Sequence, residues 1–272
     1  MAHAGERAQR RVAVCGAAGV VTPLGVRVEV INPSVPWPRT GRGHLVVSNQ
    51  VTWLDELALL VAVRALPVAN AEIGDRKLVG GLARRLGVVL VQPGRLRSVA
   101  DGVAQATHRL RRGQSISVQP DGPTSCGVAL GRFRPAFFQA AVDAGALVCP
   151  VVIRYRVDGE VATTLPCQVR DDTLPRSMAR VAAARDLVVE VHLLPALDAT
   201  TGDRRTLAAL AEYAVAEVTE ARRPTAACHP DRRAFTTSRP SVTPPAPRRT
   251  AELREASPGS GGSSDRTGRD RG

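Results

Sequence analysis

Apolar and polar residues follow each other along this chain with two periods, one typical of strands and one typical of helices. Residues 26–30, V-R-V-E-V, alternate strictly, so we expect an edge strand with one solvated face. Short apolar runs at 45–47 and 88–91 predict buried strands, the second of them covered on both faces. Further strands are expected at 115–119, 148–157 and 187–194. An early proline, Pro150, suggests an edge position or an irregular start for its strand.

The clearest helical pattern covers residues 98–112. Val99, Val103 and Leu110 fall on one face at about 100° per residue, and His108 falls on the opposite, solvent side. The other helices are expected at 53–64, 78–86, from about 135, at 178–184 and at 204–220. Strands that alternate with helices predict an α/β fold, a single domain with a mostly parallel central sheet flanked by helices.

The two ends of the chain differ from the part between them. Residues 12–26 carry no charge, but glycines and a proline interrupt them and they are shorter than the roughly 20 residues of a membrane span. We interpret residues 1–25 as an N-terminal segment on a membrane surface; a signal-peptide core behind three arginines is the weaker alternative. The folded domain is expected at 26–220. Residues 221–272, rich in Pro, Arg, Ser, Thr and Gly, are predicted to be disordered.

The charge distribution bears on the partners. The net charge is +12, and the tail at 221–272 holds 11 Arg against 5 acidic residues, or half of it. The mildly basic domain suits an anionic membrane or acidic ligands. Phe235 is the only aromatic residue among the tail's charges, which argues against nucleic-acid binding.

The cysteine pattern indicates the compartment. Five cysteines, an odd number with no C-x-x-C spacing, argue against a disulfide framework and a zinc ribbon. We therefore expect a cytoplasmic protein that is peripheral on the membrane, without a bound metal.

Candidate chemistry lies in the polar turns that follow two predicted strands. The strand at 45–47 runs into Asn49, Gln50 and, at the start of the next helix, Asp55. The strand at 115–119 runs into Asp121 and Gly122. Open α/β sheets bind their ligands beyond the carboxyl ends of their strands, so we expect the site there.

These turns resemble the motifs of the glycerolipid acyltransferases, the lysophosphatidic acid acyltransferase family. The first motif, Asn-His, four residues, Asp, resembles Asn49, Gln50 and Asp55, with glutamine in place of the histidine. The third, Pro-Glu-Gly-Thr, resembles the stretch from Pro120 to Pro123, followed directly by Thr124. The resemblance spans residues 24–218, in the family's order.

Two further stretches complete the resemblance. The second motif resembles residues 87–94, with Pro93 at the position of the family's arginine. The fourth resembles residues 148–155 around Pro150, and the stretch Phe133-Arg134-Pro135 is also similar to the family's sequence. The resemblance implies an acyltransferase-like fold and a role in phospholipid biosynthesis.

The resemblance also implies the reaction. A fatty acyl group would move from acyl-CoA or acyl carrier protein to a hydroxyl of a lysophospholipid of the lysophosphatidic acid type, without a bound cofactor. In the family the histidine is the general base and the aspartate orients it. Gln50 can hold a hydroxyl but cannot take its proton, and loss of a general base typically costs about 10² to 10⁴ in rate. Asp55 is a poor replacement unless burial raises its pKa. Impaired catalysis is therefore expected.

Binding residues follow from the same comparison. We assign substrate binding to Asp121, Gly122 and Thr124. Because Pro93 cannot supply a charge, Arg95 and Arg134 are the candidates for the acceptor's phosphate, and Arg97 and Arg132 are the alternatives. A non-catalytic lipid or acyl-thioester binding protein of the same fold remains the competing hypothesis.

Overall fold

The computed structural model describes residues 2–31, 37, 43–75, 77–122, 130–161, 165–167 and 173–220. The predicted disordered tail at 221–272 and the candidate Thr124 lie outside this range.

Eight α-helices and one 3-10 helix are present in the described residues. They are α1 (Ala2–Val21), α2 (Leu54–Val63), α3 (Ala71–Gly74), α4 (Lys77–Leu86), α5 (Leu96–Arg111), α6 (Phe138–Ala144), α7 (Leu174–Ala183), η1 (Ala199–Thr201) and α8 (Arg204–Glu220). The pattern predicted five of them, α2, α4, α5, α7 and α8, with boundaries that match or differ by a few residues. The helix α6 begins three residues after the predicted start at Pro135.

Nine strands of the described residues form one sheet. They are β1 (Arg27–Ile31), β2 (His44–Ser48), β3 (Leu66–Asn70), β4 (Val89–Val91), β5 (Ile116–Val118), β6 (Leu147–Val157), β7 (Glu160–Val161), β8 (Val188–Leu193) and β9 (Leu197–Asp198). The main order is β1-β8-β6-β2-β5-β3-β4, with β7 and β9 paired to β6. The strands β6, β2, β5, β3 and β4 are parallel, whereas β8 runs antiparallel to β6. The predicted α/β fold with a mostly parallel sheet is confirmed.

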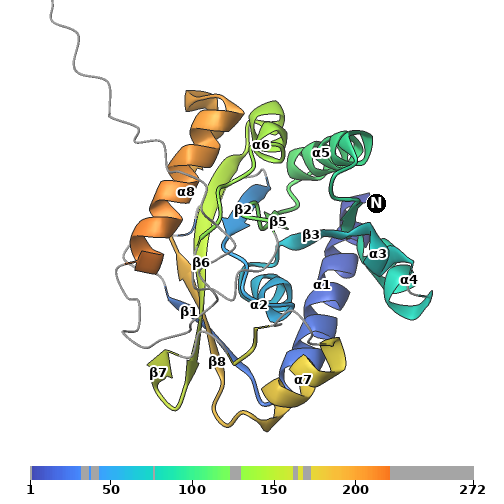
Figure 1. Cartoon of the computed structure of the whole chain (residues 1–272). Coiled ribbons are helices and arrows are strands. Elements are labelled where there is room, and N and C mark those ends of the chain that lie inside the picture. The colour runs from blue at the N-terminus through green and yellow to red at the C-terminus, as the bar shows by residue number, and fades with distance from the viewer. Residues whose placement is uncertain are drawn as a thin grey trace, which may run out of the picture. The chain divides into compact units, whose positions relative to one another are not determined.

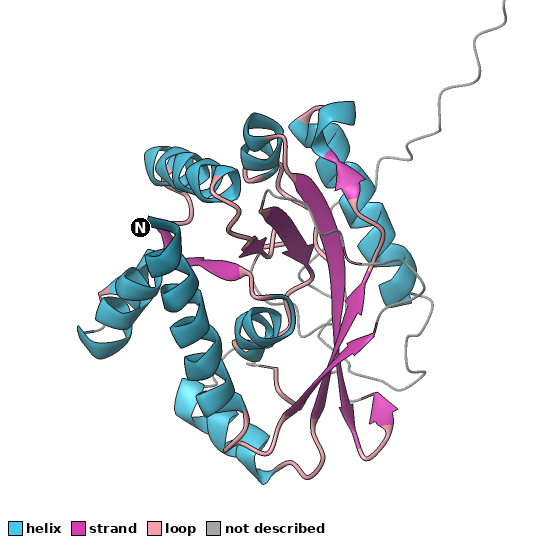
Figure 2. Ribbon diagram, turned by 180° about the vertical axis from the view of Figure 1, so that it is seen from behind, coloured by secondary structure: helices cyan, strands magenta, loops and turns pink. Residues whose placement is uncertain are grey.

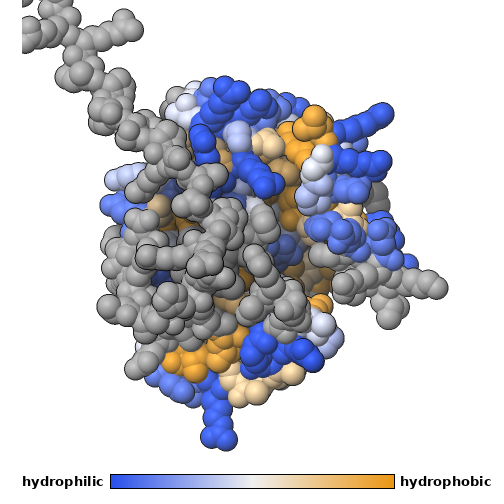
Figure 3. Space-filling model, viewed as in Figure 1, coloured by the Kyte–Doolittle hydropathy of each residue, from blue (hydrophilic) through white to orange (hydrophobic). Residues whose placement is uncertain are grey.

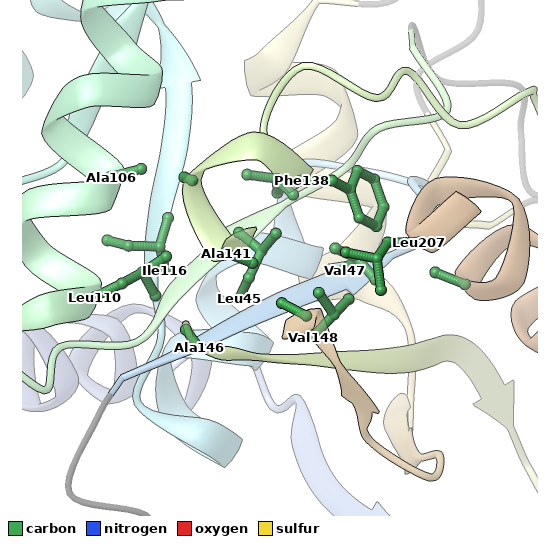
Figure 4. Packing of buried hydrophobic residues seen from close by; sticks show 14 of the residues in the cluster. Leu45, Val47, Ala106, Leu110, Ile116, Phe138, Ala141, Ala146, Val148 and Leu207 are labelled. Atoms are coloured by element: carbon green, nitrogen blue, oxygen red, sulfur yellow. The ribbon is translucent and has the colours of Figure 1, made fainter. Parts of the chain in front are cut away.

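Helices cover both faces of this sheet. In Figures 1 and 2, α8 lies on one side of the long strand β6, and α1, α2 and α7 lie on the other. Side chains of α5, α6 and α8 pack on β2, β5 and β6 in one core, shown in Figure 4 by residues such as Phe138, Leu207 and Val47. A second core packs Leu59 of α2 and Val181 of α7 on β6 and β8.

The structure shows where the strands β6 and β4 lie in the sheet. The strand β6, for which Pro150 suggested an edge position or an irregular start, lies between β2 and β8 and not at an edge. The proline is tolerated there because its carbonyl accepts from the N–H of Leu194, so its missing N–H would point to the same side. On that side β8 has ended at Leu193 and β9 has not begun. The strand β4, predicted to be covered on both faces, lies at an edge of the sheet; Val89 and Val91 are buried and Leu90 is partly buried.

The N-terminal segment is part of the folded domain. Ala13, Ala17 and Val21 of α1 are buried, and α1 packs against α2 and α4. Within the described ranges, no helix is both long enough and apolar enough to cross a membrane. Val12 and Val20 of α1 are exposed, and contact of this helix with a membrane surface stays a prediction.

A substitution at Gly102 tests how tightly α5 packs on the sheet. A Cβ at this position would lie 2.5 Å from Cγ2 of Val91 and 3.3 Å from Cζ of Phe137. We expect Gly102→Ala to lower the free energy of unfolding by about 1–3 kcal/mol through overpacking. The control Gly19→Ala on α1, where the added Cβ meets nothing within 4 Å, should gain about 0.5–1 kcal/mol from helix propensity. Urea denaturation measures both, and equal gains would contradict the packing at Gly102.

Candidate functional site

The first and third sequence motifs meet at the carboxyl ends of two neighbouring strands. Val47 of β2 is paired with Val118 of β5, and Gln50 and Asp121 each come three residues later in the chain. The backbone N–H of Gln50 donates to Oδ2 of Asp121 at 3.1 Å. Parallel strands in register therefore bring together two turns that are 71 residues apart.

Asn49 fixes the end of β2 to β6. Its side-chain amide donates from Nδ2 to the carbonyl of Ile153 at 3.0 Å and accepts at Oδ1 from the N–H of the same residue at 2.8 Å. Asn49 is buried. Because both bonds go to backbone groups, the amide holds the start of the turn in one position against the sheet.

The carboxylate of Asp55 holds the rest of that turn. Oδ2 accepts from the backbone N–H of Val51 at 2.5 Å and of Thr52 at 2.9 Å, and Oδ1 accepts from the hydroxyl of Tyr155 at 2.5 Å. Asp55 is fully buried in the first turn of α2. The positive end of the helix dipole favours a carboxylate there. The aspartate therefore fixes the two residues that directly follow Gln50 to the start of α2.

Burial shifts the titration of the two aspartates. Desolvation raises the pKa of Asp55 to about 7, although the bonds from Tyr155, Val51 and Thr52 oppose it and the nearby charge of Asp121 adds to it. Desolvation also raises the pKa of Asp121 to about 6, against the bond from Gln50. From the sequence, Asp55 is a poor replacement for the base unless burial raises its pKa, and burial does raise it. Both of its oxygens, however, already accept hydrogen bonds.

Asp121 differs from Asp55 because one of its carboxylate oxygens accepts no hydrogen bond from the described residues. Its Oδ1 is buried and has no hydrogen-bond partner in the part of the chain that the structure describes. The hydroxyl oxygen of Thr52 is in the same situation. Buried polar atoms are rarely left unpaired in proteins, so this oxygen is placed to accept a proton or a hydrogen bond from a ligand.

Two cavities adjoin the turn after β5. The first has a volume of about 530 Å³ and is lined by charged and apolar groups of three segments: Asp121, residues 132–135, and Arg205, Ala208, Ala209 and Glu212 of α8. The second, of about 170 Å³, is lined mainly by apolar groups: Val68, Pro93, Val99, Val118, Gln119, Pro120, Gly122, Arg134, Ala136 and Phe137. Figure 3 shows hydrophobic surface between α5 and α6, with hydrophilic surface around it. The two cavities adjoin at Arg134, which lines both of them.

Comparison with known proteins assigns the family. The family model described as Acyltransferase matches residues 27–154. The 1-acyl-sn-glycerol-3-phosphate acyltransferase of Neisseria meningitidis serogroup B is 30% identical over 69% of this chain and 72% of its own length. The chain belongs to the glycerolipid acyltransferase family. It is an acyltransferase by this relationship.

Two further relatives agree with this assignment. The lyso-ornithine lipid O-acyltransferase of Pseudomonas aeruginosa is 31% identical over 71% of each chain. The crystal structure of the 1-acyl-sn-glycerophosphate (LPA) acyltransferase PlsC from Thermotoga maritima superposes with a TM-score of 0.59 over 78% of each chain, at 22% sequence identity. The second comparison shows a shared fold.

The structure of this acyltransferase brings some of the predicted residues together and leaves another apart. Gln50, Asp121 and Gly122 lie in adjoining turns, and a Cβ built on Gly122 would be 3.4 Å from Nη2 of Arg134. Arg95 instead donates to the side chain of Gln92 at 3.1 Å and is exposed. Arg95 does not line either cavity. Among the described residues, no group of three His, Cys, Asp or Glu side chains could hold a metal ion.

Three residues of this region were not recognised in the sequence. Tyr155 comes from β6, and Arg205 and Glu212 come from α8. Tyr155 shares the strand with the fourth motif and is the only aromatic residue there, which is a usable signal. Arg205 and Glu212 resemble ordinary solvated charges of a helix, so only the packing of α8 beside residues 132–135 reveals them.

Tyr155→Phe tests the carboxylate at the centre of the turn. At about pH 8, where Asp55 is mostly ionised, we expect a loss of about 1.5–3 kcal/mol in the free energy of unfolding, and at about pH 5 a loss nearer 1 kcal/mol. The native pKa of Asp55 lies above its ordinary value, so the native state binds more protons than the unfolded state between about pH 4 and 7, and stability falls as the pH rises. Removing the donor raises this pKa further and steepens the fall.

Urea denaturation at both pH values measures this effect. Tyr213→Phe is the matched control, because that ring is 69% exposed on α8. An equal loss at both pH values in Tyr155→Phe would show that the hydroxyl does not stabilise a charged Asp55.

Proposed function

We propose that this acyltransferase moves a fatty acyl group from a thioester, acyl-CoA or acyl carrier protein, to a hydroxyl of a lysophospholipid. The bond from the backbone N–H of Gln50 to Asp121 supports the proposal, because among the described residues the other oxygen of this carboxylate has no hydrogen-bond partner. The names of the relatives support a lysolipid acceptor. They include acceptors of different headgroups at 30% and 31% identity, so similarity alone does not choose the headgroup.

The reaction needs a proton acceptor and no resident cofactor. The acceptor's hydroxyl oxygen attacks the thioester carbonyl, a C–O bond forms, and the C–S bond breaks as the thiolate leaves and takes up a proton. In this proposal the side chain of Gln50 binds the acceptor's hydroxyl, and Oδ1 of Asp121 accepts the proton of that hydroxyl. A carboxylate with a pKa of about 6 is largely ionised at neutral pH and is a stronger base than an ordinary aspartate. Asp55 positions the turn.

The glutamine limits the rate. An amide binds a hydroxyl without accepting its proton, and losing a well-placed general base typically costs about 10² to 10⁴ in rate. As a weaker proton acceptor, the carboxylate of Asp121 recovers part of this loss in rate. A slow enzyme is the expected result, acting as a peripheral protein at the cytoplasmic surface of the membrane where its lipid substrates lie.

Removal of the carboxylate tests the proton acceptor. With labelled acyl-CoA and a lysophospholipid, we expect Asp121→Asn to lower kcat by about tenfold or more. The asparagine oxygen can still accept from the N–H of Gln50. In the native protein kcat/KM should rise with pH through about 6 and level off above it, since the ionised form is active. Asp101→Asn, an exposed position on α5, is the control, and an unchanged Asp121→Asn enzyme would exclude the assigned role.

Restoring the imidazole tests the site as a whole. Gln50→His should raise kcat by about an order of magnitude or more, because an imidazole can accept the proton. Turnover is measured with the same substrates, alongside sedimentation of the protein with lysolipid vesicles. Binding without turnover in both the native protein and this variant would favour the non-catalytic lipid or acyl-thioester binding protein.

A further inference from the structure

The first cavity has opposite charges along one wall. Arg205, Ala208, Ala209 and Glu212 of α8 line it, at spacings that place them on one face of the helix. The two alanines leave open space in the middle. Arg205 and Glu212 are seven residues apart, or about 10 Å along the axis, so they are too distant to neutralise each other in an ion pair.

The opposite wall adds positive charge. Arg132 and Arg134 line the cavity from the segment before α6. No ion pair joins either of them, or Arg205, to an acidic residue within the described parts of the chain. Glu212 is half-buried, and its Oε2 accepts from the backbone N–H of Phe133 at 2.8 Å. That bond holds the carboxylate in place and leaves its other oxygen for a ligand.

We infer that this cavity binds the headgroup of a zwitterionic lysolipid. Its phosphate or carboxylate would lie among Arg132, Arg134 and Arg205, and its ammonium group would bind Glu212. The inference rests on the proposed function and specifies its acceptor. The volume of about 530 Å³ falls within the range of ligand pockets, about 300–1,000 Å³.

Two acidic side chains line the cavity, Glu212 and the Asp121 assigned to the reacting hydroxyl, and they decide against a purely anionic headgroup. A phosphate monoester would gain from the three arginines but would also bring more negative charge into the cavity that holds Glu212. A carboxylate that is desolvated by a ligand without a cationic partner is unfavourable. An ammonium group in the same headgroup removes this penalty and gains a charged hydrogen bond.

Acceptor selectivity tests the inference. The full chain is assayed with lysophosphatidylethanolamine, with its N-acetylated form, in which the ammonium is removed, and with a lysolipid that carries a carboxylate and an ammonium. We expect kcat/KM for the free-amine form to exceed that for the N-acetylated form by about tenfold or more. Comparable use of the third lipid would indicate that carboxylate and phosphate are interchangeable at the arginines.

A charge-neutral variant separates the role of Glu212 from the fold. Glu212→Gln keeps an oxygen that can accept from Phe133, and we expect it to reduce the selectivity ratio to about twofold or less. Glu217→Gln, exposed on the same helix, is the matched control and should keep the native ratio. Urea denaturation checks that both variants fold.

Binding without the acyl donor separates this inference from the proposed function. Sedimentation with vesicles that contain either form of the lysolipid should show preferential binding of the free amine, and the preference should be lost in Glu212→Gln. Preferential binding with no turnover of any acceptor would overturn the proposed function and leave the headgroup site standing. Turnover with equal use of the two forms, unaffected by Glu212→Gln, would overturn the headgroup site alone.

Discussion

A buried carboxylate holds this site together. Asp55 lies at the start of α2 and accepts hydrogen bonds from Val51, Thr52 and the hydroxyl of Tyr155. Three donors on one desolvated group fix the turn between β2 and α2, and with it the direction of the N–H of Gln50. Because that N–H binds Asp121, the geometry of one turn sets the distance to the next. Removal of any partner would leave charge or polar groups buried without compensation.

In the proposed function, the same arrangement supplies a proton acceptor although the family's histidine is absent. Within the described residues, both oxygens of Asp55 accept hydrogen bonds, whereas Oδ1 of Asp121 has no partner. Desolvation raises the pKa of Asp121 to about 6, which makes a weak base stronger without a change of residue type. Whereas the family separates base and orienting group into histidine and aspartate, we assign the two tasks here to two aspartates.

The proposed headgroup site is built from elements far apart in the chain. The segment before α6 supplies Arg132 and Arg134, and α8 supplies Arg205 and Glu212. The stretch of the second motif, where Pro93 stands for an arginine, contributes to the smaller, mainly apolar cavity. Where Pro93 replaces the arginine of one motif, three arginines line the neighbouring cavity, and in our proposal Glu212 among them selects a headgroup that carries an ammonium group.

The sequence alone determined the fold class, most of the helices and strands, and the order of the motifs, because periodicity and turn residues are local properties. It also identified Gln50, Asp55 and Asp121 as the residues to compare with the family. Only the tertiary structure decided that β6 is a central strand despite its proline and that Arg95 lies outside the cavities. It also decided that Glu212 lines the first cavity, together with Asp121 and three arginines. These outcomes depend on which elements pack side by side, and the pattern of a single strand or helix does not contain that information.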